Sequence, residues 1–225
     1  MASLRLKVVL TGERHVGKSM FARAACAAVV DPAQAMAAPN TQPTLGTDVV
    51  QLAFSAGGVP VELVLWDTGG YPASRNDPST VNVFRGCNAI VLVYDVTSRD
   101  SFNALPQRLA GMRPHAPDHA TVTVLGTKID LVPTAGRAVP RQEAAAYAAS
   151  IDATFAEASC LAAHSQTVVA ALDAIVGRAA AHAGRPGATR LPKPLPCRVA
   201  SSSTCRLVSS AGRSSQPPAA DHAGT

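Results

Sequence analysis

The sequence predicts a three-layer α/β fold, in which helices cover both faces of a mostly parallel sheet. Apolar, β-branched runs alternate with helical stretches along the first 183 residues. Several of these runs are almost continuously apolar, which is typical of strands buried on both faces of a parallel sheet. The short segment "SAGG" at 55–58 joins two of the runs as a hairpin turn would, and it predicts one antiparallel edge strand.

Six strands and four long helices follow from this alternation. Right-handed crossovers are expected to connect the parallel strands, and ligands of such folds bind where the loops gather at the carboxyl ends of the strands. The strands are expected at residues 4–11, 48–54, 61–66, 89–96, 120–127 and 153–158, and the helices at about 18–30, 101–112, 140–150 and 165–183.

The last part of the chain, residues 184–225, has a different character. It is rich in Pro, Ser, Gly and Arg and shows no periodicity, so we expect a disordered tail after a folded domain at 1–183. The tail holds six basic residues and one acidic residue, and it therefore carries the whole formal net charge of +5. Because the domain itself is balanced in charge, nucleic-acid binding is not expected.

Other features of the composition indicate a cytoplasmic chain. No run of 18 apolar residues is present, and Arg5 and Lys7 interrupt the apolar start "MASLRLKVVL", unlike a signal peptide. The five cysteines form no CxxC pair, and the cysteines and histidines show no metal-ligand spacing. We therefore expect reduced thiols and no metal site built from His and Cys.

A phosphate-binding loop is predicted between the first strand and the first helix. "GERHVGKS" matches the pattern GxxxxGK[ST] from Gly12 to Ser19. Its glycines allow backbone N–H groups to surround a phosphate at a helix N-terminus, whose dipole favours anions. Lys18 would reach the β- and γ-phosphates, and the Ser19 hydroxyl would bind Mg²⁺. A glycine-rich turn that only caps the helix is the alternative.

Two further motifs follow in the order that nucleotide binding requires. "WDTGG" ends the third strand about 50 residues after the lysine, where Asp67 can hold Mg²⁺ through water and the Gly70 N–H can meet a γ-phosphate. "GTKIDL" closes the fifth strand and contains Asp130. A carboxylate there can accept hydrogen bonds from N1–H and the 2-amino group of guanine, which adenine does not offer.

With these motifs the chain resembles a Ras-superfamily small GTPase, and the Rab branch is the most similar. The resemblance extends from about residue 4 to residue 183. It rests on "GERHVGKS", "PTLGTD", "WDTGG", "VFRG", "AIVLVYDVTSRDSF", "GTKIDL" and "EASCL", which stand in the family's order and spacing. It implies the small G-protein form of the P-loop NTPase fold, binding of GTP or GDP with Mg²⁺, and hydrolysis of GTP.

The resemblance also assigns roles to individual residues. Thr44 matches the first-switch threonine, which binds Mg²⁺ beside Ser19 and Asp67 and senses the γ-phosphate. The residues implied in catalysis are Lys18, Thr44, Gly70 and Tyr71. Those implied in nucleotide binding are Gly12, Val16, Gly17, Lys18, Ser19, Met20, Thr44, Asp67, Gly70, Thr127, Lys128, Asp130, Ser159 and Cys160.

Two departures from the family pattern predict slow hydrolysis. Tyr71 stands where the family has the glutamine that orients the attacking water, and Pro72 follows it. Arg14 fills a loop position that is glycine or small in most relatives. It either acts in cis on the γ-phosphate or points to solvent and obstructs an approaching arginine finger, and the second alternative is favoured.

The family resemblance implies protein partners but leaves the location open. Effectors, an exchange factor and a GTPase activator would contact the two switch regions, 31–48 and 67–84. The chain carries no C-terminal prenylation motif, although acylation of Cys197 or Cys205 with the basic tail would give weak association with intracellular membranes. A solvated tail is favoured. A non-hydrolysing interaction scaffold in a soluble complex, such as one of ciliary transport, is the alternative function.

Overall fold

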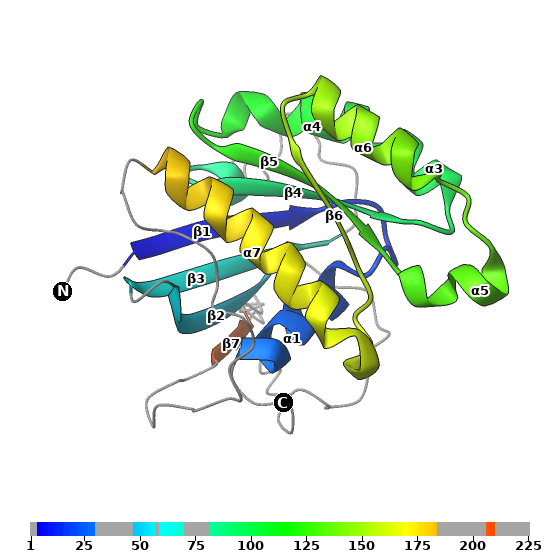
Figure 1. The fold of residues 1–225 in the computed structure, drawn as a ribbon. Coiled ribbons are helices and arrows are strands. Elements are labelled where there is room, and N and C mark those ends of the chain that lie inside the picture. Colours follow the sequence, from blue (N-terminus) through cyan, green and yellow to red (C-terminus); the bar gives the residue numbers. More distant parts are fainter. Residues whose placement is uncertain (1–3, 30–46, 57–58, 70–81, 184–205, 210–225) are drawn as a thin grey trace, which may run out of the picture.

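A single mixed sheet forms the centre of the structure. The computed structural model describes residues 4–29, 47–56, 59–69, 82–183 and 206–209. Within them the strand order is β6-β5-β4-β1-β3-β2-β7 (Figure 1). Strand β2 runs antiparallel to both of its neighbours, β3 and β7, and the other neighbouring strands are parallel. The strands are β1 Leu4–Thr11, β2 Thr47–Ala56, β3 Val59–Thr68, β4 Ala89–Asp95, β5 Thr121–Thr127, β6 Thr154–Ala158 and β7 Arg206–Ser209.

Helices cover both faces of this sheet, which confirms the predicted three-layer α/β fold. Helices α1 and α7 pack on one face, and α3, α4 and α6 pack on the other. The α-helices are α1 Lys18–Val29, α3 Arg99–Asn103, α4 Leu105–Met112, α5 Val132–Ala135, α6 Arg141–Ser150 and α7 Ser165–His182. Short 3₁₀ turns occupy Arg113–His115, Ile129–Leu131 and Ala162–His164.

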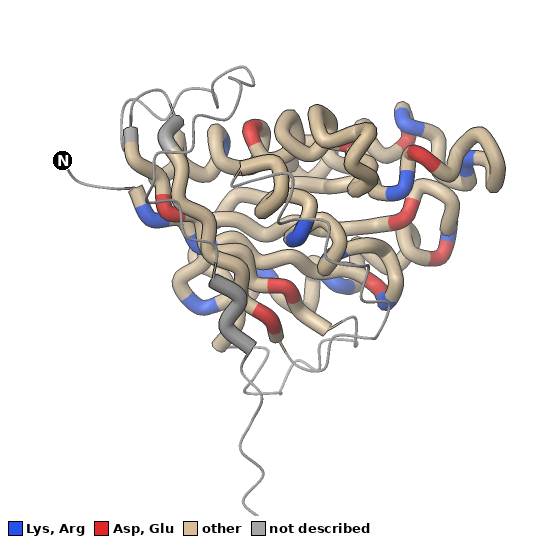
Figure 2. Tube along the Cα trace, turned by 90° about the horizontal axis from the view of Figure 1, so that it is seen from below, with Lys and Arg blue, Asp and Glu red and all other residues tan. Residues whose placement is uncertain are grey.

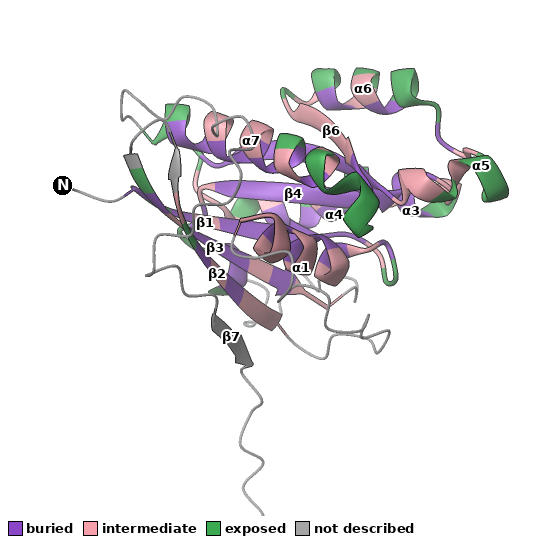
Figure 3. Ribbon diagram, turned by 60° about the horizontal axis from the view of Figure 1, so that its bottom comes forward, coloured by how far each residue is buried: buried purple, intermediate pink, exposed green. Residues whose placement is uncertain are grey.

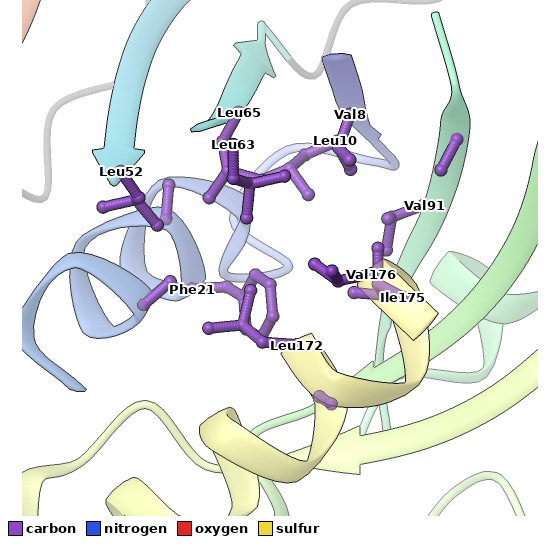
Figure 4. Packing of buried hydrophobic residues seen from close by; sticks show 14 of the residues in the cluster. Val8, Leu10, Phe21, Leu52, Leu63, Leu65, Val91, Leu172, Ile175 and Val176 are labelled. Carbon is purple, nitrogen blue, oxygen red and sulfur yellow. The ribbon is translucent and has the colours of Figure 1, made fainter. Parts of the chain in front are cut away.

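The core on the α1 and α7 side is built from alternate residues of the strands. Leu6, Val8 and Leu10 of β1 face this side, whereas Val9 faces the other, as the period of two requires. Phe21 of α1 lies within this core (Figure 4). The other labelled side chains around it are Leu52, Leu63, Leu65, Val91, Leu172, Ile175 and Val176.

The centre of the sheet is buried on both faces. Every residue of β4 is buried, in agreement with its almost continuously apolar sequence (Figure 3). Every residue of β5 is buried as well, although threonines alternate with its apolar residues. On the second face Tyr94, Phe102 and Tyr147 contact one another edge to face, with neighbouring ring centroids 5.1 and 5.6 Å apart. Exposed residues lie on the outer sides of α5 and α6.

The helix expected at about 101–112 is divided into two. α3 begins after Ser98, whose side chain accepts a hydrogen bond from the Ser101 N–H, and it ends before Ala104. Pro106 lies in the first turn of α4, where its missing N–H costs little. In one continuous helix the proline would interrupt the hydrogen-bond ladder, so the chain starts a new helix.

A seventh strand extends the six-stranded sheet that the sequence predicted. β7 comes from the segment expected to be a disordered tail, and it pairs with β2 from Asp48 opposite Ser209 to Gln51 opposite Arg206. Arg206–Ser209 thus form a strand, and the disordered tail predicted for 184–225 otherwise stays a prediction. Without a neighbour, the outer edge of β2 would leave backbone N–H and C=O groups without hydrogen bonds. The short segment "RLVS", with two apolar residues at its centre, supplies partners for them. The remainder of 184–225 lies outside the described residues.

One cysteine also departs from the prediction of reduced thiols. Cys26 on α1 is disulfide-bonded, whereas Cys87 and Cys160 are free thiols. Cys26 is part of the half-buried shell packed against the core. The spacing of the cysteines in the sequence carries no information on this pairing.

The charges of the described domain are mixed. Figure 2 shows basic and acidic residues interspersed along the tube rather than gathered by sign. Among the helices of the described residues, none combines the length and the apolar character that crossing a membrane requires.

Candidate nucleotide-binding site

The predicted site residues gather at one edge of the sheet. The parallel strands β1, β3, β4, β5 and β6 all end there, and the loop that follows β1 enters helix α1 (Figure 1). The phosphate-loop residues follow β1, Asp67 is near the end of β3, and Ser159 follows β6. This edge is the place where folds of this type bind ligands.

The two glycines of the phosphate loop are required by the backbone. A Cβ at Gly12 would lie 2.1 Å from the carbonyl oxygen of Val93, so β4 leaves no room for a side chain. Gly17 has φ +95°, a conformation that side chains disfavour. Between them, Arg14 and His15 are exposed, and His15 has φ 60°. The basic residues in the middle of the loop thus occupy its outer side.

Lys18 folds back over the loop and is buried. Its Nζ donates to the carbonyl of Gly12 at 3.1 Å and to that of Glu13 at 2.7 Å. Burial lowers the pKa of Lys18 to about 8; Asp67 and Glu13 oppose this shift, and Arg108 adds to it. The ammonium group therefore already lies at the inner face of the loop, where a phosphate would be held.

Ser19 and Asp67 form the centre of the candidate magnesium site. The Ser19 hydroxyl donates to Asp67 Oδ2 at 2.5 Å, and Asp67 is 2% exposed. Thr68 anchors the end of β3 by donating from Oγ1 to the Leu10 carbonyl at 2.8 Å. A hydroxyl and a buried carboxylate in contact are hard oxygen ligands of the kind that Mg²⁺ prefers, so this donor set fits the ion.

The predicted base-reading carboxylate is held in place from the other side of the site. Ser159 Oγ donates to Asp130 Oδ1 at 2.6 Å and accepts from the Leu161 N–H at 3.3 Å. The Ser159 N–H in turn donates to Thr167 Oγ1 at 3.0 Å. Since Ser159 is fully buried, solvent does not compete for its hydroxyl, and this chain of hydrogen bonds orients the half-buried Asp130 carboxylate.

Lys128 is fixed by an ion pair at the end of β4. Its Nζ lies 2.8 Å from Asp95 Oδ2, and its backbone has the left-handed φ of 62°. Asp95 also accepts from the N–H and the hydroxyl of Thr97 at 2.8 and 2.7 Å. Burial alone would raise the pKa of Asp95, but the hydrogen bonds from Lys128 and Thr97 outweigh it, and the net shift is downward.

Thr127 links the base end of the site to the phosphate loop. Its buried hydroxyl hydrogen-bonds to the carbonyl of Val16 in the loop and, at 2.9 Å, to that of Tyr94 in β4. Val16 is itself buried, and Met20 is half-buried on α1. Burial, followed by the nearby Asp130, raises the pKa of the half-buried Cys160 to about 12, so its thiol stays protonated.

Three of the predicted site residues cannot be placed. Thr44, Gly70 and Tyr71 lie outside the described residues, together with most of both predicted switch regions. The hydrolytic end of the site therefore remains a sequence-based prediction.

The structure adds four residues to the site that sequence reasoning missed. Asp95 and Thr97 hold Lys128, and Glu13 is paired with Arg108 of α4. Arg108 is 95 residues away from its partner in the sequence, and neither residue belongs to a pattern that names the other. Asp95 stands in the quoted "LVYDVTSRDSF", which was used only as a mark of the family.

Comparison with known proteins defines the class to which this site belongs. Residues 7–180 match the Ras family, and this chain is a member of that family. The match covers the phosphate loop, Asp130, Ser159 and every helix of the described residues except the last two residues of α7.

Individual relatives narrow the class to the Rab-like branch of the Ras-superfamily small GTPases. Ras-related protein Rab-31 of Rattus norvegicus is 33% identical over 159 residues, which cover 71% of this chain and 76% of the relative. Ras-related protein Rab-22A of Canis lupus familiaris is 32% identical over 159 residues, which again cover 71% of this chain and 76% of the relative. Ras-related protein Rab-30 of Homo sapiens is 31% identical over 153 residues, which cover 68% of this chain and 70% of the relative. The resemblance inferred from the motifs is confirmed.

Proposed function

We propose that this chain is a guanine-nucleotide-binding switch of Rab type that hydrolyses GTP slowly and acts in intracellular vesicle and protein transport. The observation that carries the proposal is the meeting of three arrangements at one sheet edge. Lys18 lies on the phosphate-loop carbonyls, Ser19 contacts Asp67, and Ser159 holds Asp130. Together they match the phosphates, the metal ion and the base of one nucleotide.

At the phosphate end of the site, the loop residues bind the negatively charged phosphates. Lys18 moves from the carbonyls of Gly12 and Glu13 towards the β- and γ-phosphates, and loop N–H groups donate to the same phosphates. Ser19, Asp67 and Thr44 would hold Mg²⁺, and the ion would supply positive charge that neutralises the phosphates. The Gly70 N–H donates to the γ-phosphate.

At the base end, the pocket selects guanine. Asp130 accepts from N1–H and the 2-amino group, while the Lys128 stem lies along the base and the Cys160 N–H completes the pocket. Because Ser159 already occupies one side of the Asp130 carboxylate, the remaining oxygen lone pairs have a fixed direction. An adenine would leave a carboxylate without its partners, which costs about 1–3 kcal/mol or more.

Hydrolysis is slow in this proposal because the group that orients water is changed. Tyr71 offers one hydroxyl in place of the paired donor and acceptor of a glutamine amide. Arg14 is exposed at the outer side of the loop, which supports the alternative in which it obstructs an incoming arginine finger. The GTP form therefore persists until an activator supplies the missing groups.

The proposed partners follow from the nucleotide cycle. Effectors, an exchange factor and a GTPase activator contact residues 31–48 and 67–84, whose order changes with the nucleotide. The protein acts in the cytoplasm with a solvated basic tail; acylation of Cys197 or Cys205 would add weak peripheral contact with intracellular membranes.

The test is nucleotide loading followed by single-turnover hydrolysis. Purified full-length protein is loaded with radiolabelled GTP, and retained nucleotide and released phosphate are followed with and without Mg²⁺. We expect Mg²⁺-dependent retention and slow phosphate release, and faster release in Tyr71→Gln. Retention without any phosphate release, in the wild type and in Tyr71→Gln, would instead support the non-hydrolysing scaffold. Absence of bound nucleotide at micromolar GTP would refute the proposal.

A further inference from the structure

A buried arginine on α4 is joined to the second residue of the phosphate loop. Arg108 donates to Glu13 Oε1 from Nε at 3.0 Å and from Nη2 at 2.5 Å. Only 6% of the Arg108 side chain is exposed, against 41% of that of Glu13. The pair therefore connects a helix on the second face of the sheet to the loop after β1.

The burial of Arg108 makes this contact more than a surface ion pair. An exposed pair contributes about 0–1 kcal/mol, because water screens it and the side chains lose freedom. A buried guanidinium has lost its water and needs hydrogen-bond acceptors in fixed positions. Glu13 Oε1 is such an acceptor, because it receives hydrogen bonds from two N–H groups of the planar Arg108 guanidinium. Moving Glu13 would thus cost more than moving an exposed acid.

Glu13 also takes part in the phosphate loop through its backbone. Its carbonyl accepts the shorter of the two hydrogen bonds from Lys18 Nζ, 2.7 Å against 3.1 Å for Gly12. The same residue is consequently held by Arg108 through its side chain and in contact with the phosphate-binding lysine through its backbone. A change at Arg108 can reach Lys18 through this one residue.

We propose that Arg108 is a positioning residue for nucleotide binding: by holding the Glu13 carboxylate it fixes the part of the phosphate loop on which Lys18 lies. The inference rests on the proposed binding of guanine nucleotide at this loop. Arg108 does not touch the nucleotide; it lowers the free energy of binding by keeping the loop in its binding conformation before the ligand arrives.

A positioning role and a purely electrostatic role of the Arg108–Glu13 pair predict opposite changes in nucleotide affinity when the Glu13 carboxylate is removed. If the pair acted only through charge, removing the carboxylate would make the loop more positive and would tighten binding of a phosphate ligand. If the pair acts by position, removing the carboxylate frees the loop and weakens binding. Glu13→Ala thus separates the two accounts by the sign of its effect.

The experiment measures equilibrium affinity for fluorescent GDP and for a non-hydrolysable GTP analogue with full-length protein and Mg²⁺. Glu13→Ala and Arg108→Gln are each expected to raise Kd about tenfold, the effect of losing one charged hydrogen-bonding contact. The double variant should be no weaker than the weaker single variant, because both changes remove one interaction. Glu13→Gln, which keeps an acceptor oxygen, should lose less affinity than Glu13→Ala.

Arg99→Gln is the matched control. Arg99 of α3 forms a comparable pair with Glu143 of α6, but that pair is 39% and 43% exposed and lies away from the loop, so its loss should leave Kd within about twofold. Circular dichroism reports whether each variant is folded, and the half-exposed Glu13 allows a test even where Arg108→Gln does not fold.

Distinct results separate this inference from the proposed function. Failure of the wild type to bind either nucleotide would refute both. A wild type that binds tightly, with Glu13→Ala unchanged or tighter, would overturn the positioning role alone. A lower melting temperature with unchanged Kd would show a purely structural pair and would likewise overturn it.

Discussion

At the scale of single residues, the candidate site is made of buried charges that already have partners. Lys18, Asp67 and Asp95 are 6%, 2% and 8% exposed. An unpaired charge in such surroundings costs several kcal/mol, and each of these three is in contact with a residue on another strand or loop. The protein itself therefore holds these three side chains in place, and of the three only Lys18 has to exchange its partners when a phosphate binds.

The pKa of Asp95 gives a prediction for stability against pH. Its folded pKa is below its ordinary value, so its contribution to stability is complete above the unfolded pKa of about 3.9 and is lost as the pH falls through the folded pKa. Asp95→Asn should therefore destabilise the protein at pH 6, and its effect should shrink as the pH falls below about 3.9. Urea unfolding between pH 3 and 6 measures both curves.

Asp118→Asn serves as the control for this measurement, because Asp118 is exposed on a loop. It should leave the free energy of unfolding almost unchanged at every pH. A constant difference between wild type and Asp95→Asn across the whole range would contradict the assignment of the Lys128 contact to the ionised carboxylate.

The motif residues were predictable from the sequence, and their supports were not. Lys18, Ser19 and Asp67 stand in patterns whose spacing along the chain is diagnostic, and in the structure Ser19 contacts Asp67 while Lys18 lies on the carbonyl of Glu13. Glu13 and Arg108 meet across 95 residues, where a pattern along the chain has no information. Such pairs depend on how α4 packs, which only the folded structure decides.

At the scale of elements, α7 is held to the sheet by one apolar stripe. Leu172, Ile175 and Val176 lie in the core beside Phe21 of α1 (Figure 4). Leu172→Ala should destabilise the fold by about 2–5 kcal/mol, since it removes a fully buried side chain and leaves a cavity. Urea unfolding at neutral pH measures the loss.

Leu161→Ala is the matched control, with the same chemistry at a residue that is 52% exposed. Its effect should stay within about 0.5 kcal/mol. Equal losses in the two variants would contradict the packing of α7 described here.

The pairing of β7 with β2 gives a prediction for hydrogen exchange. Deleting residues 206–225 from the chain leaves the outer edge of β2 without its neighbour, so amides within 48–51 should exchange faster. Amides of β4, which lies between β1 and β5, should be unaffected. Unchanged exchange in 48–51 would contradict the seventh strand.

Strands were easier to predict than the other elements. A continuous apolar run marks β4 because both of its faces are buried, and β-branched residues mark β5, which is also buried on both faces. The break between α3 and α4 depends on where Pro106 falls relative to a helix start, which a count of apolar residues does not reveal. β7 has no signal of its own, because its pairing depends on the free edge of β2.

At the scale of the whole molecule, strand order places the two ends of the site. The phosphate loop follows β1, which lies between β3 and β4, and the base-reading residues follow β5 and β6 at the sheet's far edge. Thr127 connects the two ends through its contact with Val16. A nucleotide would thus lie across the carboxyl ends of β1, β4 and β5, with guanine at the β5 and β6 end.

The most direct test of this account is the base preference of Asp130→Asn, measured as equilibrium affinities for GTP and xanthosine triphosphate. Xanthine carries an oxygen where guanine has its 2-amino group, so an asparagine can donate where the aspartate accepts. The wild type should prefer GTP, and the variant should reverse that preference by about a hundredfold or more. An unchanged preference in Asp130→Asn would contradict the assignment of this edge of the sheet as a guanine-nucleotide site.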